Sequence, residues 1–150
     1  MEISIREITK NDLTKVAQLF DLYRQFYEQA PDIDRAYKFI ADRFNKSESV
    51  ILVAESSKEE LVGFCQLYPT FCSVEAAPIF SLYDLFVLPS ARKLGVGKAL
   101  LLTAEAKAIA EGKVRMDLTT AKTNFSAQSL YESLGWERDN IFYAYNRHPK

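Results

Sequence analysis

Hydrophobic positions recur along the chain with two spacings, and these predict a series of strands and helices. The alternation of apolar and polar residues over 3–7 is typical of a half-buried strand. Apolar residues three and four positions apart, such as Leu13, Val16 and Phe20, are typical of one helix face. The expected strands cover residues 3–7, 49–55, 61–68, 79–87, 114–120, 136–138 and 141–146. The expected helices run from the capping pair 11–12 to about 27, and over 33–45, 97–111 and 124–134.

Three details of this pattern bear on the fold class. Residues 79–87 are almost entirely apolar or aromatic, which predicts a central strand covered on both faces. Pro69 cannot donate a ladder hydrogen bond, so it predicts a bulge or a sheet edge. Gly112 is the expected left-handed cap of helix 97–111, whose wide apolar arc predicts burial. Because helices and strands alternate without repeats or linkers, we predict one mixed α/β domain over residues 1–150.

The composition argues against several classes of protein. The chain has 150 residues, with 19 Lys and Arg against 20 Asp and Glu, so its formal net charge is −1. This charge provides no general attraction to nucleic acid or to an anionic membrane. The 10 Phe and 8 Tyr residues argue against disorder. No apolar run approaches the roughly 20 residues that a membrane-spanning helix needs.

Cysteine and histidine provide no metal or redox motif. Cys65 and Cys72 lack the spacing of a metal-binding or redox pair, and His148 is the only histidine. The first seven residues alternate in polarity and do not follow the order of a signal peptide. We therefore expect reduced thiols, no metal and a cytoplasmic location.

The strongest chemical feature is a glycine-containing loop between strand 79–87 and helix 97–111. Gly95 and Gly97 allow the backbone at the helix start to turn several N–H groups toward one point. The helix dipole adds positive potential there, and Arg92, Lys93 and Lys98 add formal charge. The loop is therefore predicted to bind an anion, most naturally a phosphate or pyrophosphate.

Two common nucleotide motifs do not fit this loop. A P-loop needs a glycine near Arg92 and a serine or threonine near Ala99, and a dinucleotide fingerprint needs a third glycine at Leu100. The pattern Arg92-Lys93-Leu94-Gly95-Val96-Gly97 instead resembles the pyrophosphate loop of the GNAT (Gcn5-related) N-acetyltransferases. The segment from Asn124 through Tyr131 to Gly135-Trp136 resembles the last helix of the same family.

The resemblance implies a fold, a cofactor and roles for individual residues. The fold would be a GNAT fold: a mixed, mostly antiparallel sheet of about six to seven strands flanked by about four helices. Acetyl-CoA would be the cosubstrate. The backbones of Leu85, Phe86 and Val87 would pair with its pantetheine arm. The main-chain N–H groups from Lys93 to Lys98 would cradle its phosphates.

In the second motif, Asn124 would contact the cofactor arm and Tyr131 would protonate the leaving thiolate. These two residues are seven positions apart, which is about two helical turns or roughly 10 Å. A tyrosine suits this task, because a thiolate with a pKa of about 8.5 can take a proton from a phenol near 10. The alternative role of Tyr131 is that of a core aromatic.

The attacking amine must be neutral, so a strongly basic acceptor needs a base or a water relay. Asp84 is the candidate base, because it is a lone carboxylate in an apolar strand and desolvation would raise its pKa. A buried Asp84 satisfied by local hydrogen bonds is the alternative. Tyr27, Glu28 and Tyr83 occupy positions that resemble acceptor contacts in the polyamine branch of the family. Tyr83 departs from that branch, where an acidic residue is expected.

These observations favour an acetyl-CoA-dependent N-acetyltransferase that acts on a small primary amine by direct attack in a ternary complex. The alternatives are a peptide or protein N-acetyltransferase and a non-catalytic acyl-CoA sensor. The aromatic stretch at residues 141–145 is a hypothetical homodimer face, because family members often pair there.

Overall fold

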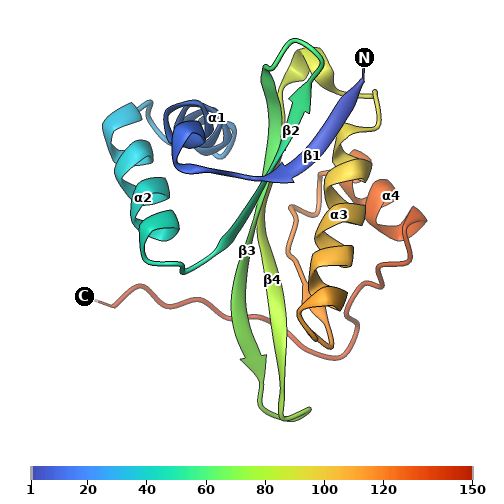
Figure 1. The fold of residues 1–150 in the computed structure, drawn as a ribbon. Helices are drawn as coiled ribbons and strands as arrows, with labels where there is room; N and C mark the ends of the chain where they lie inside the picture. Colours follow the sequence, from blue (N-terminus) through green and yellow to red (C-terminus); the bar gives the residue numbers. More distant parts are fainter. Residues whose placement is uncertain (1, 150) are drawn as a thin grey trace. The chain divides into compact units, whose positions relative to one another are not determined.

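Five strands form one sheet and follow one another in chain order: β1 (Ile3–Glu7), β2 (Val50–Ser56), β3 (Leu61–Cys72), β4 (Ala77–Val87) and β5 (Met116–Asp117). The structure is a computed structural model that describes residues 2–149. Strands β1 to β4 pair antiparallel, and β5 joins β4 in parallel at Phe80 and Ser81. The long β3–β4 hairpin forms the middle of the sheet (Figure 1). The mixed, mostly antiparallel sheet expected from the sequence is confirmed.

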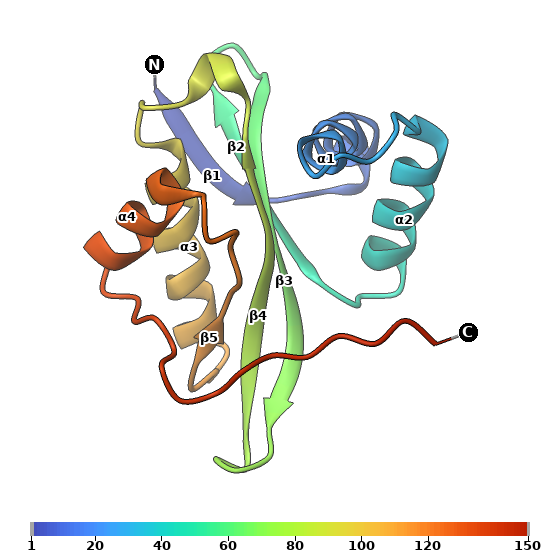
Figure 2. The same cartoon turned by 180° about the vertical axis from the view of Figure 1, so that it is seen from behind.

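Helices cover both faces of this sheet. The helices α1 (Leu13–Phe26) and α2 (Ile33–Asn45) lie on one face, and α3 (Val96–Ala110) lies on the other (Figures 1 and 2). The apolar arc predicted for α3 is buried throughout: Val96, Leu100, Leu101, Ala104 and Ala108. Gly112 follows α3 with a φ of 73°, as expected of a left-handed cap.

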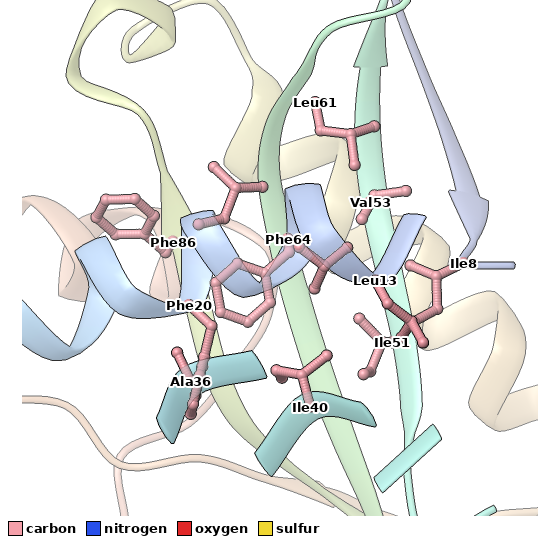
Figure 3. Close-up of a cluster of buried hydrophobic side chains, with 12 residues drawn as sticks. Ile8, Leu13, Phe20, Ala36, Ile40, Ile51, Val53, Leu61, Phe64 and Phe86 are labelled. Atoms are coloured by element: carbon pink, nitrogen blue, oxygen red, sulfur yellow. The ribbon is translucent and has the colours of Figure 1, made fainter. Parts of the chain in front are cut away.

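The core beneath α1 and α2 is built from side chains that alternate along the strands. Phe64 of β3 is completely buried and meets Phe20 of α1 edge to face, with ring centroids 6.3 Å apart. Ile40 of α2 and Val53 of β2 complete this layer (Figure 3). Each such side chain contributes about 1.5–3 kcal/mol by leaving water. The aromatic residues of the sequence therefore stabilise the junction of helices and sheet.

A network of charges joins the first strand to the start of α1. Asp12 accepts a hydrogen bond from the backbone N–H of Thr9 at 2.7 Å. Its carboxylate also accepts hydrogen bonds from both terminal nitrogens of the Arg6 guanidinium, at 2.8 and 3.0 Å. The Nε atom of Arg6 donates to Glu55 of β2 at 3.1 Å. The guanidinium hydrogen bonds lower the pKa of Asp12 to about 2.

The pairing of β3 with β4 contains an irregularity at Tyr83. Gln66 pairs with Asp84 but Leu67 pairs with Leu82, so Tyr83 is an extra residue in β4. Its side chain is 68% exposed. The expectation that β4 is covered on both faces is therefore wrong at this bulge, where an aromatic side chain lies in solvent.

The position of Pro69 is explained by the end of β2. Strand β2 pairs with β3 only as far as Leu67, so the rest of β3 has β4 as its one neighbour. Pro69 thus lies on a sheet edge, where its missing N–H costs no ladder bond. The prediction of an edge at this proline is confirmed.

The residues from Thr119 onward form a second compact unit, separate from the unit that ends at Leu118. In this unit α4 (Phe125–Ser133) begins after Asn124, whose side-chain Oδ1 accepts the N–H of Ala127 at 3.3 Å. Gly135 follows α4 with a φ of 91°. The helix and both of its ends agree with the sequence pattern.

The strands expected near the C-terminus are not formed. Up to residue 149 the sheet gains no strand after β5, so it has five strands rather than six to seven. The carboxylate of Asp139 accepts the N–H groups of Ile141, at 2.8 Å, and Phe142, at 3.2 Å. These amides are held in a local turn and do not join a ladder. The strand expected at 114–120 is also shorter and covers Met116–Asp117.

Candidate functional site

The predicted anion loop connects β4 to α3 in a conformation that only certain residues adopt. A short 3-10 helix (Pro89–Ala91) follows β4, and α3 begins at Val96. Between them Lys93 has a φ of 65° and Gly95 a φ of 81°, both in the left-handed region. A glycine takes this conformation without steric cost, so Gly95 lets the chain turn sharply into the helix.

This turn leaves a run of main-chain N–H groups without acceptors. Across residues 2–149, no hydrogen bond is made by the amide N–H of any residue from Lys93 to Lys98. The first N–H bonded to the chain after this run is that of Ala99, which donates to the carbonyl of Gly95 at 3.0 Å. Lys93, Leu94, Gly95 and Lys98 are exposed. Six consecutive amides near a helix N-terminus can bind an anion.

The three basic side chains of the loop differ in their contacts. Arg92 donates its Nε–H to the carbonyl of Val87 at 2.9 Å. Its guanidinium lies 5.7 Å from the ring centre of Phe86 and 5.9 Å from that of Phe26. Arg92 therefore ties the loop to the end of β4. Within the described part of the chain Lys93 and Lys98 form no ion pair, so their charges can add to the field of the amides.

Beyond Ser81, one edge of β4 has no strand beside it among the described residues. The N–H of Leu88 donates to Val62 of the neighbouring strand at 2.9 Å. Since backbone direction alternates along a strand, the backbone groups of Leu85 and Val87 point to the opposite, open edge. The N–H and C=O of Phe86 point toward β3. An extended ligand could hydrogen-bond to Leu85 and to the N–H of Val87 in the manner of an added strand, while the carbonyl of Val87 already accepts from Arg92.

Close packing at Gly63 sets the distance between this strand and α3. A Cβ atom on Gly63 would lie 3.0 Å from the carbonyl oxygen of Phe86 and 3.4 Å from Cγ1 of Val96. The first contact is tighter than most Cβ contacts, so a larger residue here would require the β4 backbone to shift by a few tenths of an ångström. The first turn of α3 therefore rests close against the strands that precede the loop.

Asp84 lies on the opposite face, beneath α1. Its side chain is 5% exposed and its Oδ2 accepts a hydrogen bond from Nε2 of Gln66 at 2.7 Å. Burial raises the pKa of Asp84, and hydrogen bonds from Gln66 and Tyr23 act in the opposite direction. A carboxyl with a raised pKa beside the sheet can serve as a proton acceptor near neutral pH.

Tyrosines surround this carboxyl and link the predicted acceptor contacts. The hydroxyl of Tyr23 donates to the carbonyl of Tyr83 at 3.3 Å, and its ring lies 5.2 Å from that of Tyr27. The rings of Tyr68 and Tyr83 are 5.6 Å apart. Burial and the charge of Asp84 raise the pKa of both Tyr23 and Tyr68. Both hydroxyls therefore stay protonated.

The three predicted acceptor residues thus lie at one end of α1 and on the neighbouring bulge. Tyr27 and Tyr83 both contact Tyr23, and both are largely exposed. Glu28 follows directly with a φ of 64° and an exposed side chain. The arrangement offers aromatic faces and carboxylates to a cation.

Asn124 and Tyr131 belong to the second unit, where Asn124 caps the start of α4 and Tyr131 lies in its last turn. The side-chain oxygen of Asn124 is engaged in capping α4. The ring of Tyr131 lies 6.1 Å from that of Trp136, and the main-chain N–H of Trp136 donates to the main-chain carbonyl of Tyr131 at 3.1 Å. Tyr131 is half-buried.

Sequence reasoning missed two residues of the Asp84 environment. Gln66 is completely buried, and its Oε1 accepts a hydrogen bond from the Ser49 hydroxyl at 2.7 Å. Gln66 is the single polar side chain in the apolar run Leu61 to Leu67, and that contrast was the available signal. A buried polar side chain in such a run needs a partner, which here is Asp84.

Residues 2–149 contain neither a membrane-crossing helix nor a cluster of metal ligands. None of the helices combines the length and apolar character that crossing a bilayer requires. No group of three or more His, Cys, Asp or Glu side chains is arranged to hold a metal ion.

Comparisons with known proteins place these features in context. The family model of the Acetyltransferase (GNAT) family matches residues 16–136. An uncharacterised N-acetyltransferase of Bacillus subtilis (strain 168), YhfO, is 44% identical over 143 residues, which are 95% of each chain.

Solved structures agree with this match. The crystal structure of a probable acetyltransferase superposes with a TM-score of 0.90 at 35% identity, covering 100% of this chain and 99% of that chain. The aminoglycoside N-acetyltransferase AAC(6′)-Iy in complex with CoA has a TM-score of 0.83 at 20% identity, covering 99% and 96% of the two chains. At that identity the second likeness concerns the fold alone.

Proposed function

Because the chain belongs to the acetyltransferase (GNAT) family, we propose that it transfers an acetyl group from acetyl-CoA to the primary amine of a small molecule. The transfer proceeds by direct attack of the amine on the thioester while both substrates are bound. The family match covers residues 16–136 and thus runs through both compact units, which supports one catalytic domain over the whole chain.

The observation that carries the proposal is the run of unbonded amides from Lys93 to Lys98. A pyrophosphate supplies several acceptor oxygens and negative charge, which this run and the dipole of α3 complement. Lys93 and Lys98 add positive charge, and Arg92 holds the loop against β4. The pantetheine arm extends along the open edge of β4, where the backbone of Leu85 and Val87 supplies donors and acceptors. Phe86 adds its side chain to the strand end on which Arg92 rests.

In the acceptor half, Asp84 takes a proton from the amine and Tyr131 gives one to the sulfur. The neutral amine attacks the carbonyl carbon of the thioester, and the carbon–sulfur bond breaks. The thiolate leaves with the proton of the Tyr131 hydroxyl, and the attacking nitrogen gives up its second proton, which restores that hydroxyl through solvent. The proton on Asp84 returns to solvent. Asn124, at the start of α4, contacts the cofactor arm, and Tyr131 lies near the other end of the same helix.

The chemistry around Asp84 supports a small cationic amine as the acceptor. The ammonium form is attracted by Asp84 and Glu28 and by the faces of Tyr27 and Tyr83. A peptide or protein amine is the second candidate, because Tyr27 and Tyr83 lie on the exposed surface.

The test is a measurement of thiol release from acetyl-CoA with amines supplied one at a time. Amino acids, polyamines, aminoglycosides and short peptides form the panel. Release that depends on one class of small amine is the expected result. Release with peptides alone would overturn the acceptor assignment, and tight acetyl-CoA binding without release for any amine would indicate a sensor.

The cofactor site is tested separately by calorimetry with CoA. Gly97→Asp is expected to abolish binding, because a carboxylate would enter the amide cradle. Gly112→Asp introduces the same charge at the other end of α3, where a Cβ meets no atom within 4 Å. Unchanged binding by Gly97→Asp would show that the phosphates lie elsewhere.

We also propose that the chain forms a homodimer in the cytoplasm. Ile141, Phe142, Tyr143 and Tyr145 are 77–91% exposed, so a second copy could cover an apolar stretch. Sedimentation at micromolar concentration should show a dimer, and a monomer would contradict the proposal.

A further inference from the structure

A buried hydrogen-bonded chain crosses three segments of the sheet and ends on Asp84. The hydroxyl of Ser49, just before β2, donates to Oε1 of Gln66 in β3 at 2.7 Å. Nε2 of the same amide donates to Oδ2 of Asp84 in β4 at 2.7 Å. Gln66 is 0% exposed, and its bond to Asp84 is buried, while its bond to Ser49 is partly buried. While these two bonds are made, they hold the amide in one orientation, with Nε2 toward Asp84 and Oε1 toward Ser49.

We propose that Gln66 is a positioning residue that reverses its side-chain amide when Asp84 gains or loses a proton. In the carboxylate state, Nε2 donates to Asp84 and Oε1 accepts from Ser49. In the carboxylic acid state, Asp84 donates its O–H to Oε1 and Nε2 donates to Ser49. A serine hydroxyl can donate or accept, so every partner keeps a hydrogen bond in both states.

This inference rests on the proposed function in one respect, since a general base must carry its proton for part of each cycle. A buried carboxyl without such a partner would lose its hydrogen bond in one of the two states, which is costly where water is excluded. The reversible amide removes that cost. The proton itself moves only between the acceptor amine, Asp84 and solvent.

Of the groups near Asp84, Gln66 and the hydroxyl of Tyr23 form hydrogen bonds with its carboxyl. From α1 comes the hydroxyl of Tyr23, and from β3 comes the phenol of Tyr68. The charge of Asp84 also acts on the thiol of Cys65, which neighbours Gln66 in β3 and points to the opposite face of the sheet. From β4 itself comes the carbonyl of Tyr83, which is occupied by Tyr23.

No side chain within residues 2–149 forms an ion pair with Asp84. The charges of Arg43 and Glu48, which act on Tyr68, pair with each other at 2.9 Å. The phenols and the thiol have pKa values raised by burial, so they do not titrate with Asp84.

The test uses nuclear magnetic resonance and does not depend on activity. The side-chain NH₂ signals of Gln66 and the carboxyl carbon of Asp84 are followed together as the pH is changed in the unmodified protein. The signals of both residues should shift with pH, and the two shifts should have the same midpoint pH. Gln66 signals that stay constant while Asp84 titrates would overturn the proposal.

A variant adds a second measurement. Gln66→Met keeps the length of the side chain but removes both bonds, and the bond to the charged form is the stronger of the two. The midpoint of Asp84 should therefore rise by about one pH unit. In the pH profile of kcat/KM, the midpoint of the acidic limb should move up by the same amount. Below this new midpoint, kcat/KM should then be about tenfold lower than in the unmodified protein.

Gln25→Met is the matched control, because Gln25 donates to the buried carboxylate of Asp21 at 3.1 Å, away from Asp84. This variant should leave the Asp84 midpoint unchanged. An Asp84 midpoint that is the same in Gln66→Met and in the unmodified protein would refute the inference.

Asp84→Asn separates the two hypotheses. If this variant keeps full activity, the assignment of Asp84 as the base fails, while the coupled titration of Gln66 and Asp84 still tests the inference. If Asp84→Asn is inactive and Gln66 does not respond to pH, the proposed base stands and the inference fails.

Discussion

Replacing Gly95 by alanine tests how backbone conformation supports the candidate cofactor site. Gly95 has a φ of 81°, and a Cβ built on it meets no atom within 4 Å. The substitution therefore adds no clash, and its cost is the left-handed conformation alone, about 1–2 kcal/mol for an L-residue. The free loop can relax to relieve this cost, and CoA must then restore the conformation when it binds. We expect Kd for CoA to rise about five- to thirtyfold.

The assay pairs calorimetric titration of CoA with thermal unfolding. Gly112→Ala is the matched control, because Gly112 has a φ of 73°, lies at the other end of α3 and also has open space around its Cβ. Either variant can lower Tm by about 2–8 °C, which follows from the same strain in a chain of this size. CoA affinity should fall only in Gly95→Ala.

Two results would refute this reasoning. If both variants bind CoA as tightly as the unmodified protein, the left-handed residue at the helix start has no part in binding. An equal loss in both would show that affinity follows general stability, and not the loop from Lys93 to Lys98.

Two other predictions concern proton transfer and acid stability. Tyr131→Phe should slow turnover at least tenfold while leaving CoA affinity nearly unchanged, which stopped-flow thiol release and calorimetry can check; an unaltered rate would remove Tyr131 as the acid. Asp12→Asn should lower the free energy of unfolding at pH 7 by about 1–2 kcal/mol, after allowance for the partly exposed Arg6. The folded pKa of Asp12, about 2, lies below the ordinary value of 3.8, so this difference is present above about pH 4 and disappears as the pH falls to 2. Urea unfolding from pH 7 to pH 2 measures it, and a difference that persists at pH 2 would contradict the role of the Arg6 hydrogen bonds.

Local chemistry explains why much of the fold could be predicted from the sequence. Helix α2 has the predicted bounds, Ile33–Asn45, because Pro31 and the capping side chain of Asp32 mark its start within the chain itself. Strand β1 is likewise as predicted. The loop before α3 was identified by its two glycines, whose conformational freedom is a property of the residue.

The prediction of strands near the C-terminus was wrong because a strand does not depend on local chemistry alone. Residues 141–146 have a strand-like composition, but a strand requires a neighbour. Instead the carboxylate of Asp139 takes the amides of Ile141 and Phe142. Propensity alone could not distinguish these outcomes, because they depend on which acceptor reaches those N–H groups.

The sequence by itself determined the four helices, the first four strands and the glycine-containing loop before α3, since these follow from periodicity and from side-chain type. Only the tertiary structure decided the surroundings of Asp84. Its partner Gln66 lies 18 positions away along the chain, and the bulge at Tyr83 sets the register that brings the two together. A hydrogen bond of 2.7 Å across two strands depends on that register, which arises from the packing of the whole sheet and is not encoded in any local pattern.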